Sequence, residues 1–376
     1  MALIINMKPK ILFIMHTPPP VHGSAMVGKY IHDSKLINET FDCRYINLTT
    51  AKNLEDIGKA SFSKLLKYFK LLCRIVRTVR KERPGLVYVT PNACGGAFYK
   101  DFIVVQVLKL LECRIVLHYH NKGVSTRQDR WLDDKLYRRF FKGIKVILLA
   151  EALYQDVKKY VKREDVYICP NGIPETLKEE PSAHRNNPVP RLLFLSNMLE
   201  SKGVLVLLDA CRILKEKGYS FLCDLVGGET AEINAERLGR EIKNRGLEEV
   251  VAYKGKKYGS EKQECFERSD IFVFPTFYNN ECFPLVLLEA MEQSLPCVTT
   301  DEGGIKDVVK DGETGLISEK RNPESLALCI ERLLNDVALR ERLGENGYKE
   351  FKKHFTLDAF EHRLTACVKE CYRGVF

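Results

Sequence analysis

Short apolar runs alternate along this chain with longer stretches in which apolar residues recur at helical spacing. In the first half, runs rich in β-branched residues occupy positions 11–15, 45–48, 86–90, 115–118, 146–149 and 166–169. Strands that alternate with helices in this way indicate a parallel sheet with helices on both of its faces.

The alternation stops at residues 181–190, PSAHRNNPVP, which are too rich in proline and asparagine for either element. It resumes with apolar runs at 192–196, 221–226, 250–254, 271–274 and 297–300, and the chain reads as helical after Asn322. We therefore predict an α/β protein of two Rossmann-like, doubly wound parallel-sheet domains. The predicted segments are a first domain (1–180), a linker (181–190), a second domain (191–354) and a last helix (355–376) that packs on the first domain.

Charge divides unevenly between the two halves. Residues 1–180 hold 31 Lys and Arg against 18 Asp and Glu, whereas residues 181–376 hold 28 against 32. The basic half suggests an anionic partner. The thirteen cysteines contain no C-x-x-C pair, which is typical of a reducing compartment. The first residues lack a secretory leader pattern and the apolar runs are short, so we expect a cytoplasmic protein.

The densest chemical signal lies around residues 274–290. A buried strand at 271–274 precedes Pro284, which suits the first position of a helix because its missing N–H costs nothing there. The amides of Cys282 and Phe283 would then point outward at the start of the helix. Backbone amides beside a helix N-terminus form an anion site suited to a phosphate.

Two glutamates accompany this predicted helix start. Glu281 lies just before it and Glu289 about a turn and a half inside it. A carboxylate near the entry can accept hydrogen bonds from sugar hydroxyls, and one deeper inside can accept both hydroxyls of a ribose. Taken singly, each glutamate also fits an ordinary charge at the start of a helix or on its solvated face.

The pair, written E-x7-E, resembles the donor site of the family 4 retaining glycosyltransferases, which have the GT-B fold. In that family two Rossmann-like domains face a central cleft, the first glutamate contacts the transferred sugar, and the second binds the nucleotide ribose. The resemblance implies transfer from a UDP- or GDP-sugar to a glycan or lipid-linked acceptor. An expected cytoplasmic location, together with a basic helix over residues 64–80, favours a role in the synthesis of cell-surface polysaccharide such as capsule or lipopolysaccharide. It implies no cofactor, and because the chain has no D-x-D motif we expect no metal.

Further motifs follow in the order of that family. Residues 18–24, PPPVHGS, resemble its glycine loop, in which Gly23 would approach the donor or acceptor and His22 replaces a usual glycine. Residues 116–121, VLHYHN, resemble the end of its fourth strand, and His120 matches the histidine that lies in the family's cleft. By this resemblance His120 orients the sugar near the reacting carbon.

Residues 194–204 resemble the family's G-R-x4-K-G segment. Lys202 would stabilise the leaving diphosphate, together with the start of the following helix. Asn197 replaces the family's arginine and could still donate a hydrogen bond. The later glycines, which include Gly303 and Gly315, are interpreted as turn positions without a chemical role.

A basic helix is a feature independent of the family. Lysine and arginine recur at steps of three and four over residues 64–80, with apolar residues between them. One interpretation is a surface helix packed on the sheet. The other is a face that contacts anionic lipid, and would place the protein peripherally at the inner face of the plasma membrane. The two are compatible.

Other functions remain open from sequence alone. The same fold serves sugar-nucleotide epimerases, and a degenerate chain could bind a nucleotide sugar without turnover. A glycosidase needs two carboxylates that face each other across the bond, and a nicotinamide enzyme needs a G-x-G-x-x-G turn, which this chain lacks. No motif supports nucleic-acid binding.

Overall fold

A computed structural model describes residues 8–19, 23–49, 62–176, 179, 181, 185 and 187–374 of the chain. Its contacts divide into two compact units. The first unit contains Met1–Asn171 and Leu357–Phe376, and the second contains Gly172–Thr356. The division therefore lies at Asn171 and Gly172, ahead of the predicted linker, in which residues 182–184 and 186 lie outside the described residues.

The first unit is built on a parallel sheet of six strands in the order β2-β1-β3-β4-β5-β6. Its strands are β1 Lys10–Met15, β2 Asp42–Asn47, β3 Leu86–Val89, β4 Ile115–His118, β5 Lys145–Leu148 and β6 Val166–Ile168. The inner strands β3 and β4 are buried throughout, as expected of a sheet covered on both faces. Strand β2 forms an edge and is only partly buried.

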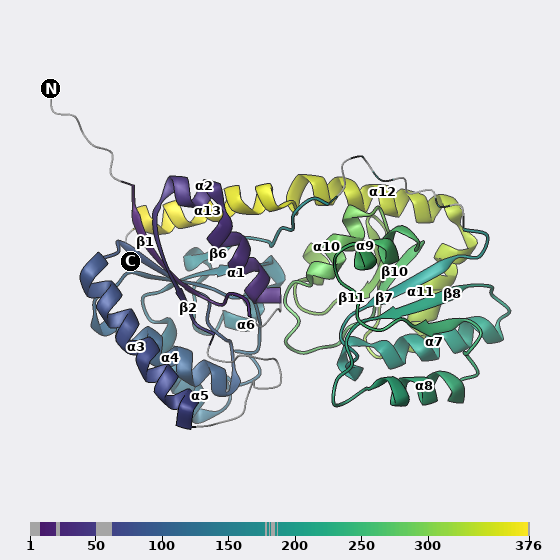
Figure 1. The fold of residues 1–376 in the computed structure, drawn as a ribbon, viewed down its shortest axis with the longest axis horizontal. Helices are drawn as coiled ribbons and strands as arrows, with labels where there is room; N and C mark the ends of the chain where they lie inside the picture. The colour runs from purple at the N-terminus through teal and green to yellow at the C-terminus, as the bar shows by residue number, and fades with distance from the viewer. Residues whose placement is uncertain are drawn as a thin grey trace. The chain divides into compact units, whose positions relative to one another are not determined.

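Helices cover both faces of this first sheet (Figure 1). One group contains α1 Gly23–Asp33, α2 Lys35–Thr40 and α13 Leu357–Arg373, the last of which contacts α2. The other group contains α3 Phe62–Glu82, α4 Gly95–Leu110 and α5 Trp131–Phe141. A short helix, α6 Tyr154–Val157, follows β5. The two groups arise because the chain leaves β1 toward one edge of the sheet and then crosses back from β2 toward the other.

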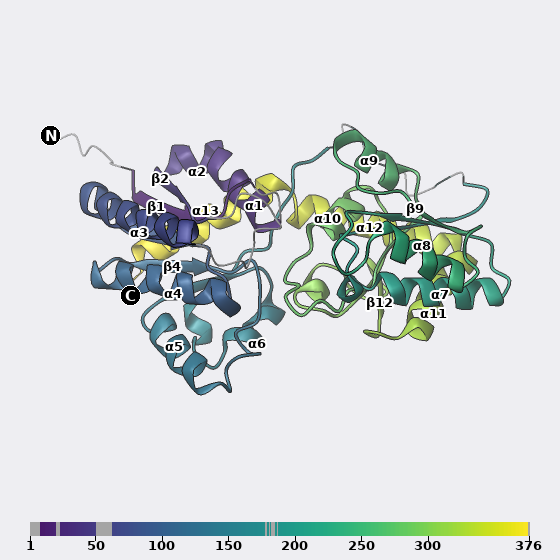
Figure 2. The same cartoon turned by 60° about the horizontal axis from the view of Figure 1, so that its bottom comes forward.

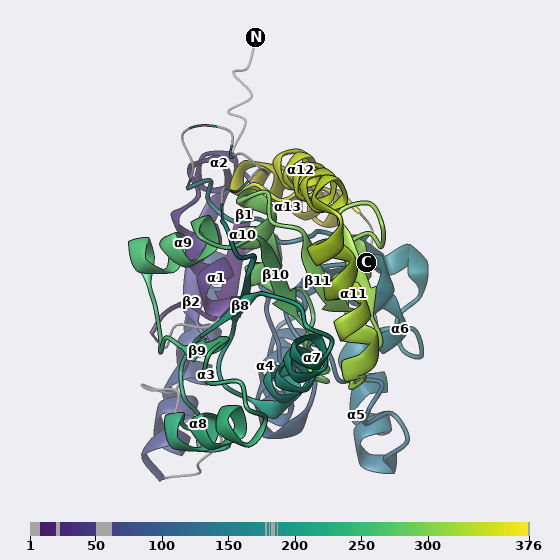
Figure 3. The same ribbon diagram turned by 90° about the vertical axis from the view of Figure 1, so that its right-hand side faces the viewer.

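The second unit repeats this plan with a parallel sheet in the order β12-β11-β10-β7-β8-β9. Its strands are β7 Arg191–Leu195, β8 Leu222–Val226, β9 Val251–Tyr253, β10 Ile271–Phe274, β11 Cys297–Thr300 and β12 Gly315–Ser318. Its helices are α7 Val204–Glu216, α8 Ala235–Asn244, α9 Gly259–Glu267, α10 Leu285–Glu292, α11 Pro323–Asn335 and α12 Val337–His354. Helix α7 contacts α8 and α11, whereas α10 contacts α12 (Figures 2 and 3).

These two sheets confirm the predicted α/β class. The strands expected at 115–118, 271–274 and 297–300 have those bounds, and the other predicted strands differ by a few residues at most. Strand β12 was not predicted, because its glycine-rich start reads as a turn. All thirteen cysteines are free thiols. Among the described residues, no helix combines the length and apolar character needed to span a bilayer.

Candidate functional site

The centre of the second sheet brings together two loops with predicted site residues. Strands β7 and β10 are neighbours, and the chain leaves them in opposite directions across the sheet. Loops that follow such a pair diverge and leave a crevice at the carboxyl ends of the strands, where α/β proteins bind ligands. Lys202 follows β7 and Glu281 follows β10.

A glycine allows these two loops to pack closely. Gly203 has a positive φ of 87°, and a Cβ atom at this position would lie 2.1 Å from the carbonyl oxygen of Pro275. The amide of Phe277 also donates a hydrogen bond of 2.8 Å to the carbonyl of Ser201. A side chain at Gly203 would therefore separate the loops that carry Lys202 and Glu281.

Lys202 and Glu281 form an ion pair of 2.5 Å between Nζ and Oε2. Both side chains are largely buried, with 16% and 11% of their surfaces exposed. The ammonium group also lies 4.6 Å from the centre of the Tyr278 ring, within the range of a cation–π contact. The structure thus joins two residues predicted from separate motifs, and it adds Tyr278, which sequence reasoning missed.

Glu289 forms a second ion pair in the same unit. Its Oε1 lies 2.6 Å from Nζ of Lys262, and both side chains are 28% exposed. Lys262 lies on α9 and Glu289 on α10. No sequence motif pointed to Lys262, because residues on different helices have no characteristic spacing.

The predicted role of Pro284 at the first position of the helix is wrong by one residue. The structure has Pro284 as the N-cap of α10, with φ −70° and ψ 117°, and the helix begins at Leu285. The fixed φ of proline suits both positions, so only ψ separates them. The side chains of Cys282 and Phe283 are buried just before the helix.

Asn197 is exposed after β7. The neighbouring backbone is held by Met198, whose amide donates a hydrogen bond of 2.8 Å to the carbonyl of Gly228. Gly227 has a positive φ of 150°, and a Cβ atom there would lie 1.7 Å from the carbonyl oxygen of Ser196. Asn197 therefore lies where the loops after β7 and β8 pack directly on each other.

The later glycines include positions of close packing, which the interpretation as simple turns missed. A Cβ atom on Gly303, where φ is 59°, would lie 2.2 Å from the carbonyl oxygen of Glu281. The amide of Gly304 donates a hydrogen bond of 2.8 Å to the carbonyl of Cys282. Gly315 lies in a strand, where its Cβ atom would lie 2.3 Å from the carbonyl oxygen of Cys297.

In the first unit, His120 is half-buried just after β4, beside the fully buried His118 that ends this strand. Its ring centroid lies 4.2 Å from that of His118, and Nδ1 of His118 lies 2.5 Å from the hydroxyl of Tyr88. Both ring nitrogens of His120 are buried and have no hydrogen-bond partner among the described residues. A buried nitrogen of this kind is costly unless a ligand or water supplies the missing bond.

Burial makes this group of imidazoles electrically neutral. It lowers the pKa of His120 to about 3, with a smaller contribution from the charge of His16. Burial likewise lowers the pKa of His118 well below its usual value, and repulsion from His120 adds to this effect. A neutral imidazole can both donate and accept a hydrogen bond, so His120 has the properties needed to contact an uncharged hydroxyl group.

Gly23 is the first residue of α1, and a Cβ atom added to it would meet nothing within 4 Å. The close approach in this region occurs at Gly28 instead, where a Cβ atom would lie 1.9 Å from the carbonyl oxygen of His16. Gly28 was missed because it lies inside a helical pattern. His22 lies outside the described residues.

The predicted basic helix is α3, and it packs on the first sheet through one apolar face. Ile75 and Val79 are buried, whereas Arg74, Arg77 and Arg80 are exposed. The side chain of Lys64 lies outside the described residues. The packed face confirms the interpretation as a surface helix. The exposed cations remain available for the second interpretation, which is contact with anionic lipid.

Comparison with known proteins relates this architecture to sugar transfer. Residues 175–350 match the family described as "Glycosyl transferases group 1". The chain is 30% identical over 306 residues to the capsular polysaccharide biosynthesis glycosyltransferase CapM of Staphylococcus aureus, and the match covers 78% of each protein. It is 28% identical over 272 residues to the amylovoran biosynthesis glycosyltransferase AmsK of Erwinia amylovora. That match covers 70% of this chain and 65% of AmsK, slightly less than two thirds of the relative.

A solved structure shares the fold at lower identity. HepE of Anabaena, determined in complex with UDP, matches with a TM-score of 0.75 and 16% identity. The match covers 96% of this chain and the whole of HepE. This likeness confirms that the two α/β units belong to the predicted GT-B type.

Proposed function

Because this chain belongs to the glycosyltransferase group 1 family, we propose that it is a retaining enzyme that transfers a sugar from a nucleotide-diphosphate donor to a glycan or lipid-linked acceptor. The observation that carries the proposal is the Lys202–Glu281 ion pair at the carboxyl ends of β7 and β10. It combines a held cation for the diphosphate with a carboxylate for the sugar. Both groups come from motifs that resemble the donor site of the retaining family.

The reaction we propose is a front-side displacement. The acceptor hydroxyl oxygen forms a bond to the anomeric carbon as the bond from that carbon to the diphosphate oxygen breaks. The hydroxyl proton passes to the departing phosphate, so no enzyme nucleophile is needed. Lys202 would stabilise the charge that develops on the diphosphate, an effect strengthened in a site partly shielded from water. Its pairing with Glu281 supports this role by holding the ammonium in a defined place.

Recognition of the nucleotide would rest on Glu289. A carboxylate accepts hydrogen bonds from two neighbouring hydroxyls, as a ribose presents them. The ion pair with Lys262 limits the side-chain freedom of Glu289, so part of the ordering entropy would be lost before the nucleotide binds. HepE, which shares the fold, binds UDP, and we infer that UDP is the first nucleotide to test here.

The acceptor side of the proposal rests on the relatives and on the first unit. CapM and AmsK act in the biosynthesis of capsular polysaccharide and amylovoran, and we propose a cell-surface polysaccharide intermediate as the acceptor. His120, neutral and without a protein partner among the described residues, would orient the sugar through its hydroxyl groups. We further propose a cytoplasmic enzyme that is peripheral at the membrane through α3.

The test is thermal stability of the full chain against UDP, GDP, ADP and their sugars, repeated with Glu289→Ala and Lys202→Ala. A ligand at 100 times its Kd stabilises the folded state by about 2.7 kcal/mol. We expect a shift with one nucleotide and a smaller shift or none in both variants. The control is Lys217→Ala, which removes an ion pair of the same length, 2.5 Å, between the C-cap residue of α7 and Glu331 on α11.

Three outcomes would contradict parts of the proposal. If the nucleotide raises the melting temperature equally in the wild type and in both variants, Lys202 and Glu289 do not bind the donor. A shift without transfer to any acceptor would leave a nucleotide-sugar-binding protein. Transfer that requires Mn²⁺ or Mg²⁺ and disappears with EDTA would overturn the expected independence of metal.

A further inference from the structure

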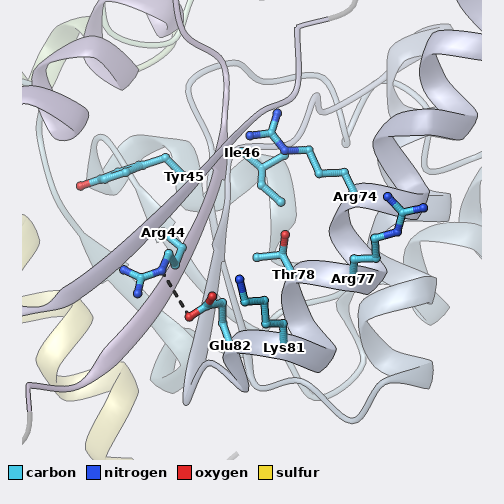
Figure 4. Close-up of a pocket in the computed structure, with 8 residues that line it drawn as sticks. All are labelled: Arg44, Tyr45, Ile46, Arg74, Arg77, Thr78, Lys81 and Glu82. Carbon is cyan, nitrogen blue, oxygen red and sulfur yellow. Dashed lines mark ion pairs between the residues drawn. The ribbon is translucent and has the colours of Figure 1, made fainter.

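A hollow between α3 and the edge strand β2 of the first unit is lined mainly by cations. It has a volume of about 250 Å³ and is partly open to solvent, and Figure 4 shows the residues that line it. Its charged lining residues are Arg44, Arg74, Arg77, Lys81 and Glu82, and Tyr45, Ile46 and Thr78 complete it. Four cations therefore face the hollow together with one carboxylate.

Regular secondary structure explains this concentration of charge. Arg74, Arg77 and Lys81 are spaced by three and four residues, so they lie in one row along α3. Arg44 and Ile46 alternate with Tyr45 along β2, which directs both of them to the same face of the strand. Figure 4 shows Arg74 and Lys81 extending from α3 toward β2, and Arg44 turned toward Glu82.

The single carboxylate of the lining is already engaged. Oε2 of Glu82 lies 3.3 Å from Nζ of Lys10 and 3.3 Å from Nε of Arg44. Arg44 also contacts Asp42 at 2.7 Å. None of the three helix cations, Arg74, Arg77 and Lys81, forms an ion pair within the part of the chain that the structure describes. Among the described residues, the hollow therefore keeps an excess of positive charge that neighbouring carboxylates do not neutralise.

We propose that this hollow binds the phosphate group of an anionic lipid headgroup. Two guanidinium groups can grip phosphate oxygens through paired N–H donors, and an ammonium group adds a point charge. The hydroxyl of Thr78 supplies a further donor on the same wall. A hollow of about 250 Å³ is smaller than the usual range for drug-sized ligands, which favours a headgroup over a whole nucleotide sugar.

Exposed apolar side chains on the same helix identify lipid as the source of that phosphate. Leu65, Leu66 and Phe69 expose 64%, 49% and 62% of their surfaces. Phe69 lies eight residues before Arg77, which is about 12 Å along a helix axis. A soluble phosphate would make no use of these side chains. A membrane would bury them in the acyl boundary and meet the cations at the headgroup level.

This inference rests on the proposed membrane association, and the experiment separates the two. Binding of the full chain is measured by sedimentation with phosphatidylcholine vesicles, with and without phosphatidylglycerol. We compare Arg74→Gln/Arg77→Gln with Lys67→Gln/Lys70→Gln, which removes two exposed cations from α3 outside the hollow. Diffuse attraction contributes about fivefold for each cation, so it would weaken both double variants by a similar factor.

A built phosphate site gives a different result. We expect Arg74→Gln/Arg77→Gln to weaken vesicle binding at least about tenfold more than Lys67→Gln/Lys70→Gln does. The difference measures the phosphate contacts, because both variants lose the same diffuse attraction. We also expect Arg74→Lys/Arg77→Lys to lose affinity, because it keeps the charge and removes the paired donors. The proposal would be overturned if Arg74→Gln/Arg77→Gln and Lys67→Gln/Lys70→Gln lose equal affinity for the vesicles while Arg74→Lys/Arg77→Lys binds as tightly as the wild type.

Two further outcomes also overturn it and identify what failed. If the wild type binds neither kind of vesicle, the membrane association itself is wrong, whereas sugar transfer to a soluble acceptor can still be tested. If inorganic phosphate binds without vesicles and depends on Arg74 and Arg77, whereas vesicle binding does not depend on them, the ligand is a soluble phosphate rather than a lipid. Unchanged melting temperatures of the variants establish that each remains folded.

Discussion

The carboxyl ends of the two sheets carry opposite kinds of chemistry. In the second unit, Lys202 pairs with Glu281 and Lys262 with Glu289, so the candidate groups are charged and balanced. In the first unit, His118 and the ring nitrogens of His120 are buried and the pKa values of both residues are lowered, so the candidate groups are neutral. One sheet end therefore suits a charged diphosphate and the other suits uncharged hydroxyl groups.

This difference arises from how each sheet end satisfies its polar groups. A buried charge needs a close partner, since removal from water costs several kcal/mol. Lys202 obtains one because Gly203 lets two loops pack closely. A buried imidazole avoids that cost by remaining deprotonated. The same parallel-sheet plan thus provides an ionic site in one unit and a neutral one in the other.

The largest expected effect comes from removal of the cation at the charged end. We expect Lys202→Ala to lower kcat about 10²- to 10³-fold, because it removes a donor aimed at the charge that develops on the leaving group. Steady-state kinetics with saturating nucleotide sugar would measure this. Lys217→Ala, which breaks a surface ion pair in the same unit, should leave kcat within about twofold of the wild type. If both variants have equal activity, Lys202 does not stabilise the leaving group.

The next effect tests why the charged pair forms at all. We expect Gly203→Ala to destabilise the protein by about 2–3 kcal/mol, because alanine disfavours a positive φ and its Cβ atom would collide with the carbonyl of Pro275. Urea unfolding would measure the loss. Gly239→Ala is the matched control: it lies within α8 with open space around it, and should stabilise by about 0.5–1 kcal/mol.

Kinetics on the same variant distinguish local strain from a role in the site. If the Gly203→Ala variant is destabilised and its kcat also falls, the loop approach positions Lys202. Unaltered stability would mean that the loops can separate without cost, which contradicts the close packing of Gly203 on Pro275.

Much of this arrangement could be predicted from sequence, because it follows from local patterns. Buried strands such as β4 and β10 are continuous apolar runs. Residues that follow neighbouring parallel strands must lie together at the carboxyl ends of those strands. Lys202 and Glu281 could therefore be assigned to one region from their motifs alone. The ion pair between Lys202 and Glu281 could not be predicted, because it depends on the conformations of two loops.

The missed features depend on contacts between distant segments. Lys262 on α9 pairs with Glu289 on α10. Tyr278 contacts Lys202 because the loops after β7 and β10 pack on each other. Gly28 and Gly303 look like ordinary glycines until the carbonyl groups beside them are located. Sequence spacing carries no information on such approaches, because each is set by the packing of one backbone on another.

The smallest expected effect tests the neutral end of the comparison through pH. An unfolded histidine has a pKa of about 6.5, whereas the pKa of folded His120 is about 3. Between these values the unfolded chain binds the proton and the folded chain does not. The contribution of His120 to stability is thus fully present above pH 6.5 and is lost as the pH falls toward 3, by at most about 1.4 kcal/mol per pH unit.

We therefore expect His120→Asn to melt with a weaker dependence on pH than the wild type between pH 6.5 and 4.5. The control is His362→Asn on α13, an imidazole that is 65% exposed and lies outside the histidine group at the end of β4. Thermal melts across this range in matched ionic strength would measure both. A slope for His120→Asn equal to that of the wild type would mean that the imidazole takes up a proton in the folded state. The first unit would then present a charged group at its sheet end, and the contrast between the two units would disappear.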